Sequence, residues 1–354
     1  MGNEHTRRAY LGTLGTAGIA GLAGCSSLIS VQRELAGRGS DLWTFATDTD
    51  ATLFPASADS TVYAGSTSGT LYAVESGSEQ WTFETGGPIQ STPAVGEKTV
   101  FVGDTERTLY AVDAETGDEK WTYSTAGPVS SSPVARGKTV YVGAKELYAV
   151  DATDGTERWT FSGDASIDSS PALGATNTVY AGSTEGNIYA VDTGEGSETW
   201  THETEGPVSL TPNVKPEEGL VGATESSVFA INLRTGQRDW ERAIDVPNQY
   251  PIYMDGYVYV AGDGTNLYNI SKEDGAWPYE LTAEVSSQIS GMVTHGAIYI
   301  GDESGRISSV NFIEGTERWT FDTNGVVRSA PAVGSGTVYV GTDTGKLYAL
   351  VEKD

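Results

Sequence analysis

Few side chains in this sequence could carry out acid–base, nucleophilic or metal chemistry. The chain contains one cysteine, Cys25, and three histidines, at positions 5, 202 and 295. A single cysteine excludes an internal disulfide framework and a multi-cysteine zinc site. No Ser/His/Asp set, Walker loop or HExxH motif is present. Acidic loop residues are so frequent that none of them indicates a calcium site by itself. We therefore expect no catalytic residue and no metal ligand.

The excess of acidic residues indicates adaptation to a salt-rich solvent more than binding of a particular ligand. The chain has 48 acidic and 21 basic residues among 354, a formal net charge of −27. Such a charge disfavours nucleic-acid binding, because each phosphate contact would meet repulsion. It is typical of the acidic surface of proteins from salt-loving microbes, where salt screens the self-repulsion. A haloarchaeal source is therefore expected, and specific cation binding is the alternative.

The N-terminal segment has the features of an export signal. The run from Thr6 to Leu11, with Arg7 and Arg8, resembles a twin-arginine motif, and the stretch before Cys25 resembles a lipobox. We expect a signal peptide at 1–24, a lipid-anchored tether at 25–40 with lipid on Cys25, and a folded domain at 41–354. This predicts a protein held at the extracytoplasmic face of the cell membrane. A chance cysteine after small residues is the alternative.

Eight tryptophans recur along the folded part at intervals of 37 to 42 residues. This period is typical of propeller blades built from four short strands. Between the tryptophans, Val-Tyr-x-Gly and Leu-Tyr-Ala-Val-Asp segments repeat, and both have the β-branched and aromatic composition of half-buried strands. We expect each tryptophan to pack against the neighbouring blade. The series is Trp43, Trp81, Trp121, Trp159, Trp200, Trp240, Trp277 and Trp319.

The order of these landmarks predicts how the ring closes. Trp43 precedes the first Val-Tyr-x-Gly segment, whereas the run Leu347 to Leu350 reaches the C-terminus with no tryptophan after it. The N-terminal strand should therefore complete the last blade, which limits the exposed edges of the sheets. We predict an all-β, monomeric, eight-bladed β-propeller of four-stranded antiparallel blades, in one domain.

The segment Ala111 to Trp121 reads Ala-x-Asp-x-x-Thr-Gly-x-x-x-Trp, and Ala149 to Trp159 and Ala230 to Trp240 match it with one substitution each. This segment resembles the tryptophan-docking motif of the pyrroloquinoline quinone (PQQ) repeat family. The resemblance implies one of two kinds of protein. One is a quinoprotein dehydrogenase that holds PQQ and calcium in its central channel, and the other is a cofactor-free scaffold similar to the lipoprotein of the bacterial barrel-assembly machinery.

Two features favour the scaffold. The repeats leave almost no room for the insertions that surround the channel of the enzymes, and the adjacent cysteine pair of many of those enzymes is impossible with Cys25 alone. We therefore expect a non-catalytic interaction or recognition module without a cofactor, whose partners are the membrane and other cell-surface proteins. A PQQ-dependent oxidoreductase and a sensor of a small polar ligand are the alternatives.

One set of residues departs from a purely structural repeat. The residue three places before the inner-strand proline, or its equivalent, is polar in every repeat. These positions should form a ring at one mouth of the channel. A hydrated channel wall is the alternative to a ligand or partner site. The strongest candidates are Gln90, Asp168, Asn248, Gln288 and Arg328.

Three further patterns complete the prediction. The fifth and sixth repeats are the least regular, which is consistent either with partner docking or with neutral drift. His202 occupies a slot that is aromatic in sister repeats, so it is expected to be a strand residue, and His295 is expected in a surface turn.

Overall fold

The computed structural model describes residues 37–174, 177–210, 219–224, 226–243, 251–254, 257–261, 266–271, 275–280, 296–311 and 316–352. These residues belong to one compact unit, Gly37–Asp354. The expected signal peptide and most of the expected tether, including Arg7, Arg8 and Cys25, lie outside the described residues. Residues 37–40, which the sequence assigned to the tether, form the start of the first strand.

Short antiparallel strands with Gly-containing turns build six four-stranded sheets. The first three contain β2 (Leu53–Ala58), β3 (Thr61–Ser66), β4 (Thr70–Glu75) and β5 (Ser78–Glu84); β6 (Ala94–Val95), β7 (Thr99–Gly103), β8 (Thr108–Asp113) and β9 (Glu119–Ser124); and β10 (Val134–Arg136), β11 (Thr139–Ala144), β12 (Glu146–Asp151) and β13 (Glu157–Phe161).

The next three sheets contain β14 (Ala172–Leu173), β15 (Thr178–Gly182), β16 (Asn187–Asp192) and β17 (Glu198–Glu203); β18 (Ser209–Leu210), β19 (Leu220–Ala223), β20 (Ser227–Ile231) and β21 (Arg238–Ala243); and β22 (Ile252–Met254), β23 (Tyr257–Ala261), β24 (Asn266–Ser271) and β25 (Gly275–Glu280). The remaining strands are β1 (Gly37–Ala46), β26 (Ala297–Gly301), β27 (Arg306–Asn311), β28 (Glu317–Asp322), β29 (Ala332–Gly334), β30 (Thr337–Gly341) and β31 (Lys346–Glu352).

The propeller architecture is confirmed, but the prediction of eight blades is wrong, because the described strands form seven sheets. The seventh sheet has seven strands in the order β26-β27-β28-β1-β31-β30-β29. Strand β1 pairs antiparallel with β31, and its first residues also pair parallel with β28, Gly37 with Trp319 and Arg38 with Thr320. This second pairing merges strands that were expected in two separate blades.

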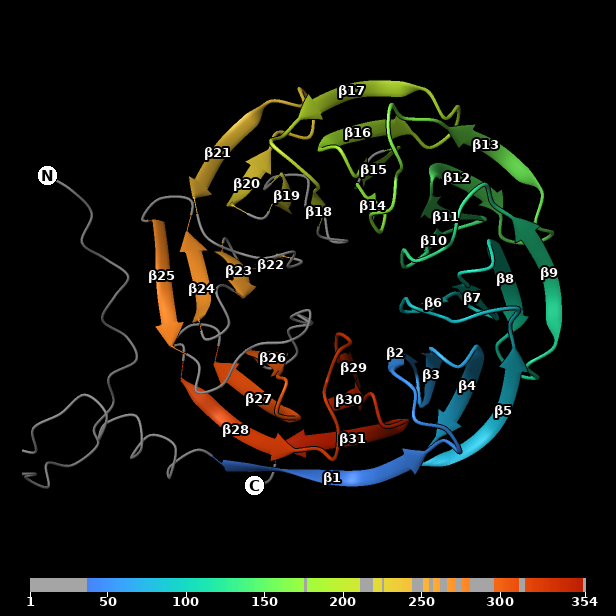
Figure 1. Ribbon diagram of the computed structural model, residues 1–354, viewed down its shortest axis with the longest axis vertical. Coiled ribbons are helices and arrows are strands. Elements are labelled where there is room, and N and C mark those ends of the chain that lie inside the picture. The colour runs from blue at the N-terminus through green and yellow to red at the C-terminus, as the bar shows by residue number, and fades with distance from the viewer. Residues whose placement is uncertain are drawn as a thin grey trace, which may run out of the picture. The chain divides into compact units, whose positions relative to one another are not determined.

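The sheets stand around a central axis, with β2, β6, β10 and β14 on the inside and β5, β9, β13 and β17 on the outside (Figure 1). Each part of the core lies between two neighbouring sheets. One cluster joins Tyr63 and Leu71 of β3 and β4 to Val100 and Val102 of β7, and another joins Leu53 of β2 to Leu347 of β31. Burial of these side chains between sheets provides the main stabilisation of the ring.

Two ends of the ring need names. The entry loops, residues 85–89, 125–129, 162–167 and 323–327, lead from an outer strand to the next inner segment, and they define the entry end. The docking turns, residues 75–78, 113–118, 151–156, 192–197 and 231–237, join the third and fourth strands of a sheet. Strands alternate in direction, so the docking turns lie at the opposite end, the docking end.

A contact between an indole and a glycine joins neighbouring sheets at the docking end. Gly117 has φ +78°, and a Cβ placed on it would lie 2.7 Å from Cδ2 of Trp81 in the preceding sheet. The Trp81 Nε1 donates to the Ala114 carbonyl of the same turn at 3.2 Å. Equivalent contacts recur for Gly77 on Trp43, Gly155 on Trp121, Gly196 on Trp159 and Gly236 on Trp200.

This geometry predicts the cost of a side chain at a docking turn. Gly117→Ala should lower the free energy of unfolding by about 2–4 kcal/mol, from left-handed backbone strain and overlap with Trp81. The matched control is Gly137→Ala, at φ +58° with nothing within 4 Å of the added Cβ, which should cost only about 1 kcal/mol. Urea unfolding measures both variants, and equal losses would contradict the docking role of Gly117.

Candidate functional site

The inner segments repeat a pattern of a buried apolar residue, an exposed polar residue and a buried serine. Ile89, Val129, Ile167 and Val327 are completely buried. The residues that follow them, Gln90, Ser130, Asp168 and Arg328, are all exposed. Alternation along an extended chain places neighbouring side chains on opposite sides, so the apolar residue anchors the segment and the polar one faces solvent.

Backbone hydrogen bonds hold these polar residues at the entry end. The amides of Ile89 and Val129 donate to the carbonyls of Ser66 and Asp104 in the preceding sheets, at 3.0 and 2.9 Å, and the amide of Ile167 donates to the Lys145 carbonyl at 3.0 Å. The segment of each sheet is therefore fixed by its neighbour just before the exposed residue.

Serine and threonine side chains join the inner segments to one another. Thr92 N donates to Ser132 Oγ at 3.1 Å, and Ser132 N donates to Ser170 Oγ at 2.9 Å, each across a sheet boundary. Within its own sheet, the buried Ser131 Oγ donates to the Gly143 carbonyl at 2.7 Å. The exposed polar residues thus stand on a rigid support.

The structure places three of the five strongest candidates at this end, while Asn248 and Gln288 lie outside the described residues. Asp168 Oδ1 accepts from Ser166 Oγ at 2.7 Å and from Lys145 N at 3.4 Å. Arg328 Nε lies 3.5 Å from Asp343 Oδ2. Asp168 and Arg328 therefore have separate local partners, and they precede β14 and β29, which lie across the axis from each other (Figure 1).

The described residues do not fit PQQ and calcium. Calcium takes six to eight oxygen ligands, several of them from carboxylates, and among the described positions of the polar ring only Asp168 carries a carboxylate. Across the described part of the chain, no group of three or more His, Cys, Asp or Glu residues could hold a metal ion. PQQ is a tricarboxylate, and the one cation of the described ring, Arg328, is already beside Asp343.

The sequence did not show how the entry loops are held. The tyrosine hydroxyl of the Leu-Tyr-Ala-Val-Asp repeat accepts a hydrogen bond from a backbone amide of an entry loop. Gly86 N donates to Tyr110 Oη at 2.9 Å, and Ala126 N donates to Tyr148 Oη at 2.9 Å. Burial, with the hydrogen bond to Glu146, raises the pKa of Tyr148 to about 12, so this hydroxyl stays protonated. The recurring Leu-Tyr pair was the only signal of this role in the sequence.

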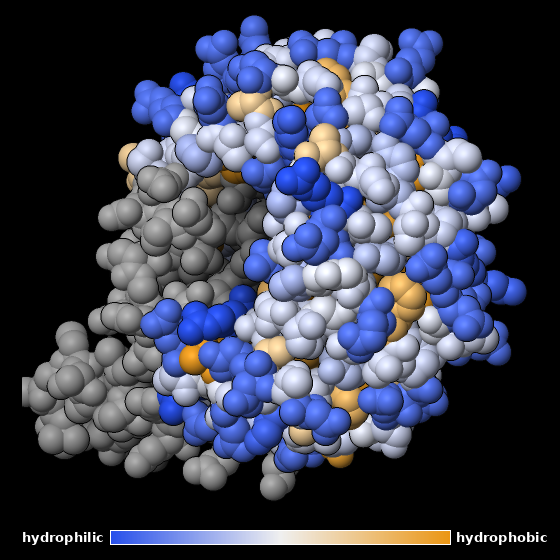
Figure 2. Space-filling model, turned by 45° about the vertical axis from the view of Figure 1, so that its right-hand side comes forward, coloured by the Kyte–Doolittle hydropathy of each residue, from blue (hydrophilic) through white to orange (hydrophobic). Residues whose placement is uncertain are grey.

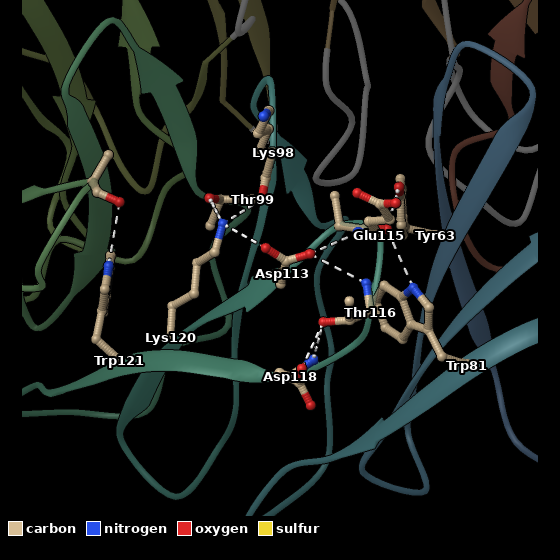
Figure 3. A network of polar contacts seen from close by, with 12 residues as sticks. Tyr63, Trp81, Lys98, Thr99, Asp113, Glu115, Thr116, Asp118, Lys120 and Trp121 are labelled. Atoms are coloured by element: carbon tan, nitrogen blue, oxygen red, sulfur yellow. Dashed lines mark hydrogen bonds and ion pairs between the residues drawn. The ribbon is translucent and has the colours of Figure 1, made fainter.

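The docking turns contain a polar network of their own (Figure 3). Asp113 Oδ1 accepts from the amides of Glu115 and Thr116 at 3.0 and 3.1 Å, and its Oδ2 lies 3.0 Å from Lys120 Nζ. The hydrogen bond from Lys120, with those from the two amides, holds the pKa of Asp113 below its usual range. This carboxylate shapes the turn that presents Gly117 to Trp81.

Of the two histidines singled out in the sequence, His202 lies in a described strand. His202 is half-buried in β17 and pairs with Ile188 of β16, as its aromatic-slot position indicated. His295 lies outside the described residues. Within the described part, no helix has the length and apolar character needed to cross a bilayer.

Three successive stretches of the chain, residues 30–146, 143–249 and 245–354, match the model of the family described as outer membrane protein assembly factor BamB. The chain belongs to this family. The resemblance to the PQQ-like repeat propellers is thereby confirmed.

Curated relatives match over part of their length. The chain is 26% identical to BamB of Kangiella koreensis over 113 residues, which is 28% of this chain and 29% of the relative. It is 26% identical to BamB of Pseudomonas aeruginosa over 156 residues, which is 40% of each. The alignments thus span less than half of these relatives.

Solved structures show the same fold over most of the chain. BamB from Moraxella catarrhalis has a TM-score of 0.76 at 18% identity, over 88% of this chain and 99% of that one. The quinohemoprotein alcohol dehydrogenase of Comamonas testosteroni has a TM-score of 0.74 at 15% identity, over 91% and 78%. BamB and an alcohol dehydrogenase therefore share this architecture, and fold alone does not decide between a scaffold and an enzyme.

The Asp113 network predicts a pH dependence. Because the pKa of Asp113 is lowered in the folded state, its stabilisation is present above the unfolded pKa of about 4 and is lost as pH falls through the folded pKa. Asp113→Asn removes this contribution and keeps an acceptor, as Asn232 does at the same place of another turn, where its Oδ1 accepts from Arg234 N at 3.1 Å. Wild type should exceed the variant in urea stability at pH 7 and match it at low pH. A gap that is the same at both pH values would contradict this role.

Proposed function

We propose that this protein is an exported, lipid-anchored interaction scaffold of the cell envelope, held at the extracytoplasmic face of the membrane through Cys25. The observation that carries the scaffold role is the match of the assembly-factor family to the chain from residue 30 onward. Export and anchoring rest on the twin-arginine-like run and on the lipobox-like stretch before Cys25. The name of the relatives describes assembly of outer-membrane proteins. With a haloarchaeal source, which the acidic composition supports, the partners are other surface proteins, because archaea of that group have no outer membrane.

The entry end of the ring is the surface that we assign to the partner. Exposed side chains of different chemistry, Gln90, Ser130 and Asp168, project from three adjacent sheets whose backbones are tied together. Variable side chains on a rigid support are typical of recognition surfaces. On the face of the molecule seen in Figure 2, hydrophobic residues are scattered among hydrophilic ones.

Site-specific photocrosslinking in native membranes tests this assignment. A benzoylphenylalanine at Gln90 or Ser130 should give an adduct of defined mass. Glu97 and Lys138 are the matched controls, because they are exposed at the opposite ends of the same inner segments and should give none. Asp168→Ala combined with Arg328→Ala should lower the adduct yield severalfold with little loss of stability, because both side chains are exposed and the exposed Arg328–Asp343 ion pair contributes about 0–1 kcal/mol.

Cys25→Ser in the full chain separates anchoring from recognition. The variant should leave the membrane fraction and lose the adduct, because two proteins confined to one surface meet at high effective concentration. Equal adducts at both ends of the ring would contradict the assignment of the entry end. Retention of Cys25→Ser in the membrane would contradict the anchor.

The quinoprotein alternative has a direct test. Purified protein incubated with PQQ and calcium and then desalted should retain no quinone absorbance and show no dye-linked alcohol oxidation, because the described ring residues do not supply the ligands. Stoichiometric quinone with alcohol oxidation would overturn the scaffold proposal.

A further inference from the structure

Among the described strands, the junction beside Trp319 has no docking turn. In the five described docking turns, a turn between the third and fourth strands of one sheet covers the tryptophan of the strand that precedes it around the ring. Next to β28 the corresponding strands are β31 and β1, which are the two ends of the fold, so no turn connects them. Trp319 is nevertheless the most buried of the described tryptophans, at 1% exposure against 8–9% for Trp81, Trp121 and Trp159.

The extended start of β1 covers Trp319 instead. A Cβ placed on Gly39 would lie 2.6 Å from Cε3 and 2.8 Å from Cζ3 of Trp319, as close as the docking-turn glycines lie to their own indoles. Gly37 and Arg38 pair in parallel with Trp319 and Thr320 of β28. Gly39 and Ser40 pair antiparallel with Glu352 and Val351 of β31.

Strand β1 divides into two parts behind this contact. Its register shifts between Asp41 and Trp43, and Leu42, at the shift, is 58% exposed. The residue at the same place in other sheets is polar or charged: Gln80, Lys120, Arg158, Thr199, Asp239 and Arg318. Lys120 binds its own sheet there, donating to Lys98 O and Thr99 Oγ1 (Figure 3). Leucine cannot donate in this way, and residues 37–41 pair with the two strands that flank them.

We propose that the gap between the edges of β28 and β31 is a binding site for an extended peptide, filled in this chain by its own residues 37–41. The two strand edges recognise the peptide backbone, in the manner of strand addition. The indole of Trp319 selects against a side chain at the peptide residue that faces it. The ligand is therefore an extended segment with glycine at that position, parallel to β28.

The site is normally saturated, because a tethered segment is present at high effective concentration. Its occupancy closes the ring, since β28 and β31 are joined through this segment. The proposal does not depend on the lipid anchor or on the partner of the entry end.

The first test is substitution of the glycine in the full chain. Gly39→Val should lower amide-exchange protection of residues 319–320 and 350–352 at least about tenfold, through overlap with Trp319. Ser40→Val, one residue along the same strand, is the control and should leave this protection unchanged. Trp319→Leu should make Gly39→Val nearly neutral, which a double-mutant cycle measures.

The second test supplies the segment in trans. A synthetic peptide with the sequence of residues 36–46 should bind the Gly39→Val protein and restore protection of residues 319–320. The same peptide with valine in place of the glycine should not, and wild-type protein should bind neither. Gly39→Ala is the milder variant should Gly39→Val not fold. Three results would overturn the proposal: unchanged amide-exchange protection in both Gly39→Val and Gly39→Ala, equal restoration of protection by the two peptides, or no restoration of protection in a variant that folds.

Discussion

Contact between a tryptophan of one sheet and a glycine of the next is the interaction on which the ring depends. A four-stranded sheet has two faces to bury and cannot bury both alone, so each sheet is stable only against its neighbours. The apolar side chains between sheets provide most of the burial, but many arrangements would bury similar area. A Cβ on Gly117 would lie only 2.7 Å from Cδ2 of Trp81, so the indole leaves room for glycine alone. The Trp81 Nε1 donates to a carbonyl of the same turn. This contact therefore fixes how closely the docking turn of one sheet approaches the tryptophan of its neighbour.

Local repetition made much of the fold predictable. The spacing of Trp81, Trp121 and Trp159 and the Val-Tyr-x-Gly segments indicated strand order and the propeller class, and the recurring polar position at Gln90 and Asp168 indicated a ring at one mouth of the channel. The number of sheets was not predictable in the same way. The merging of two sheets depends on Gly37 and Arg38 reaching Trp319 and Thr320, a pairing across some 280 residues of sequence. Residues 37–40 looked like a tether because their composition is that of one.

The candidate site was predictable in its positions and not in its contacts. Repeat alignment identified Asp168 and Arg328 as equivalent residues, because each lies three places before the proline of its repeat. Their partners, Lys145 N and Asp343, come from hairpins of differing sequence, and no repeat pattern encodes them. The tyrosine hydroxyls that hold the entry loops were hidden for another reason. Packing of the ring alone explains a tyrosine in a strand motif, so the sequence gives no reason to expect a hydrogen bond to its hydroxyl.

The hydroxyl bridges between inner segments have a consequence for how such a surface can change. Thr92, Ser132 and Ser170 connect segments through one side-chain oxygen, where a direct backbone pair would bring the strands closer. The spacing between these three segments thus includes the length of a serine side chain. Gln90, Ser130 and Asp168 each lie two residues before a bridging residue and take no part in these hydrogen bonds, so side chains of different chemistry fit there. Spacing and recognition are thus encoded at different positions, so one can diverge while the other stays constant.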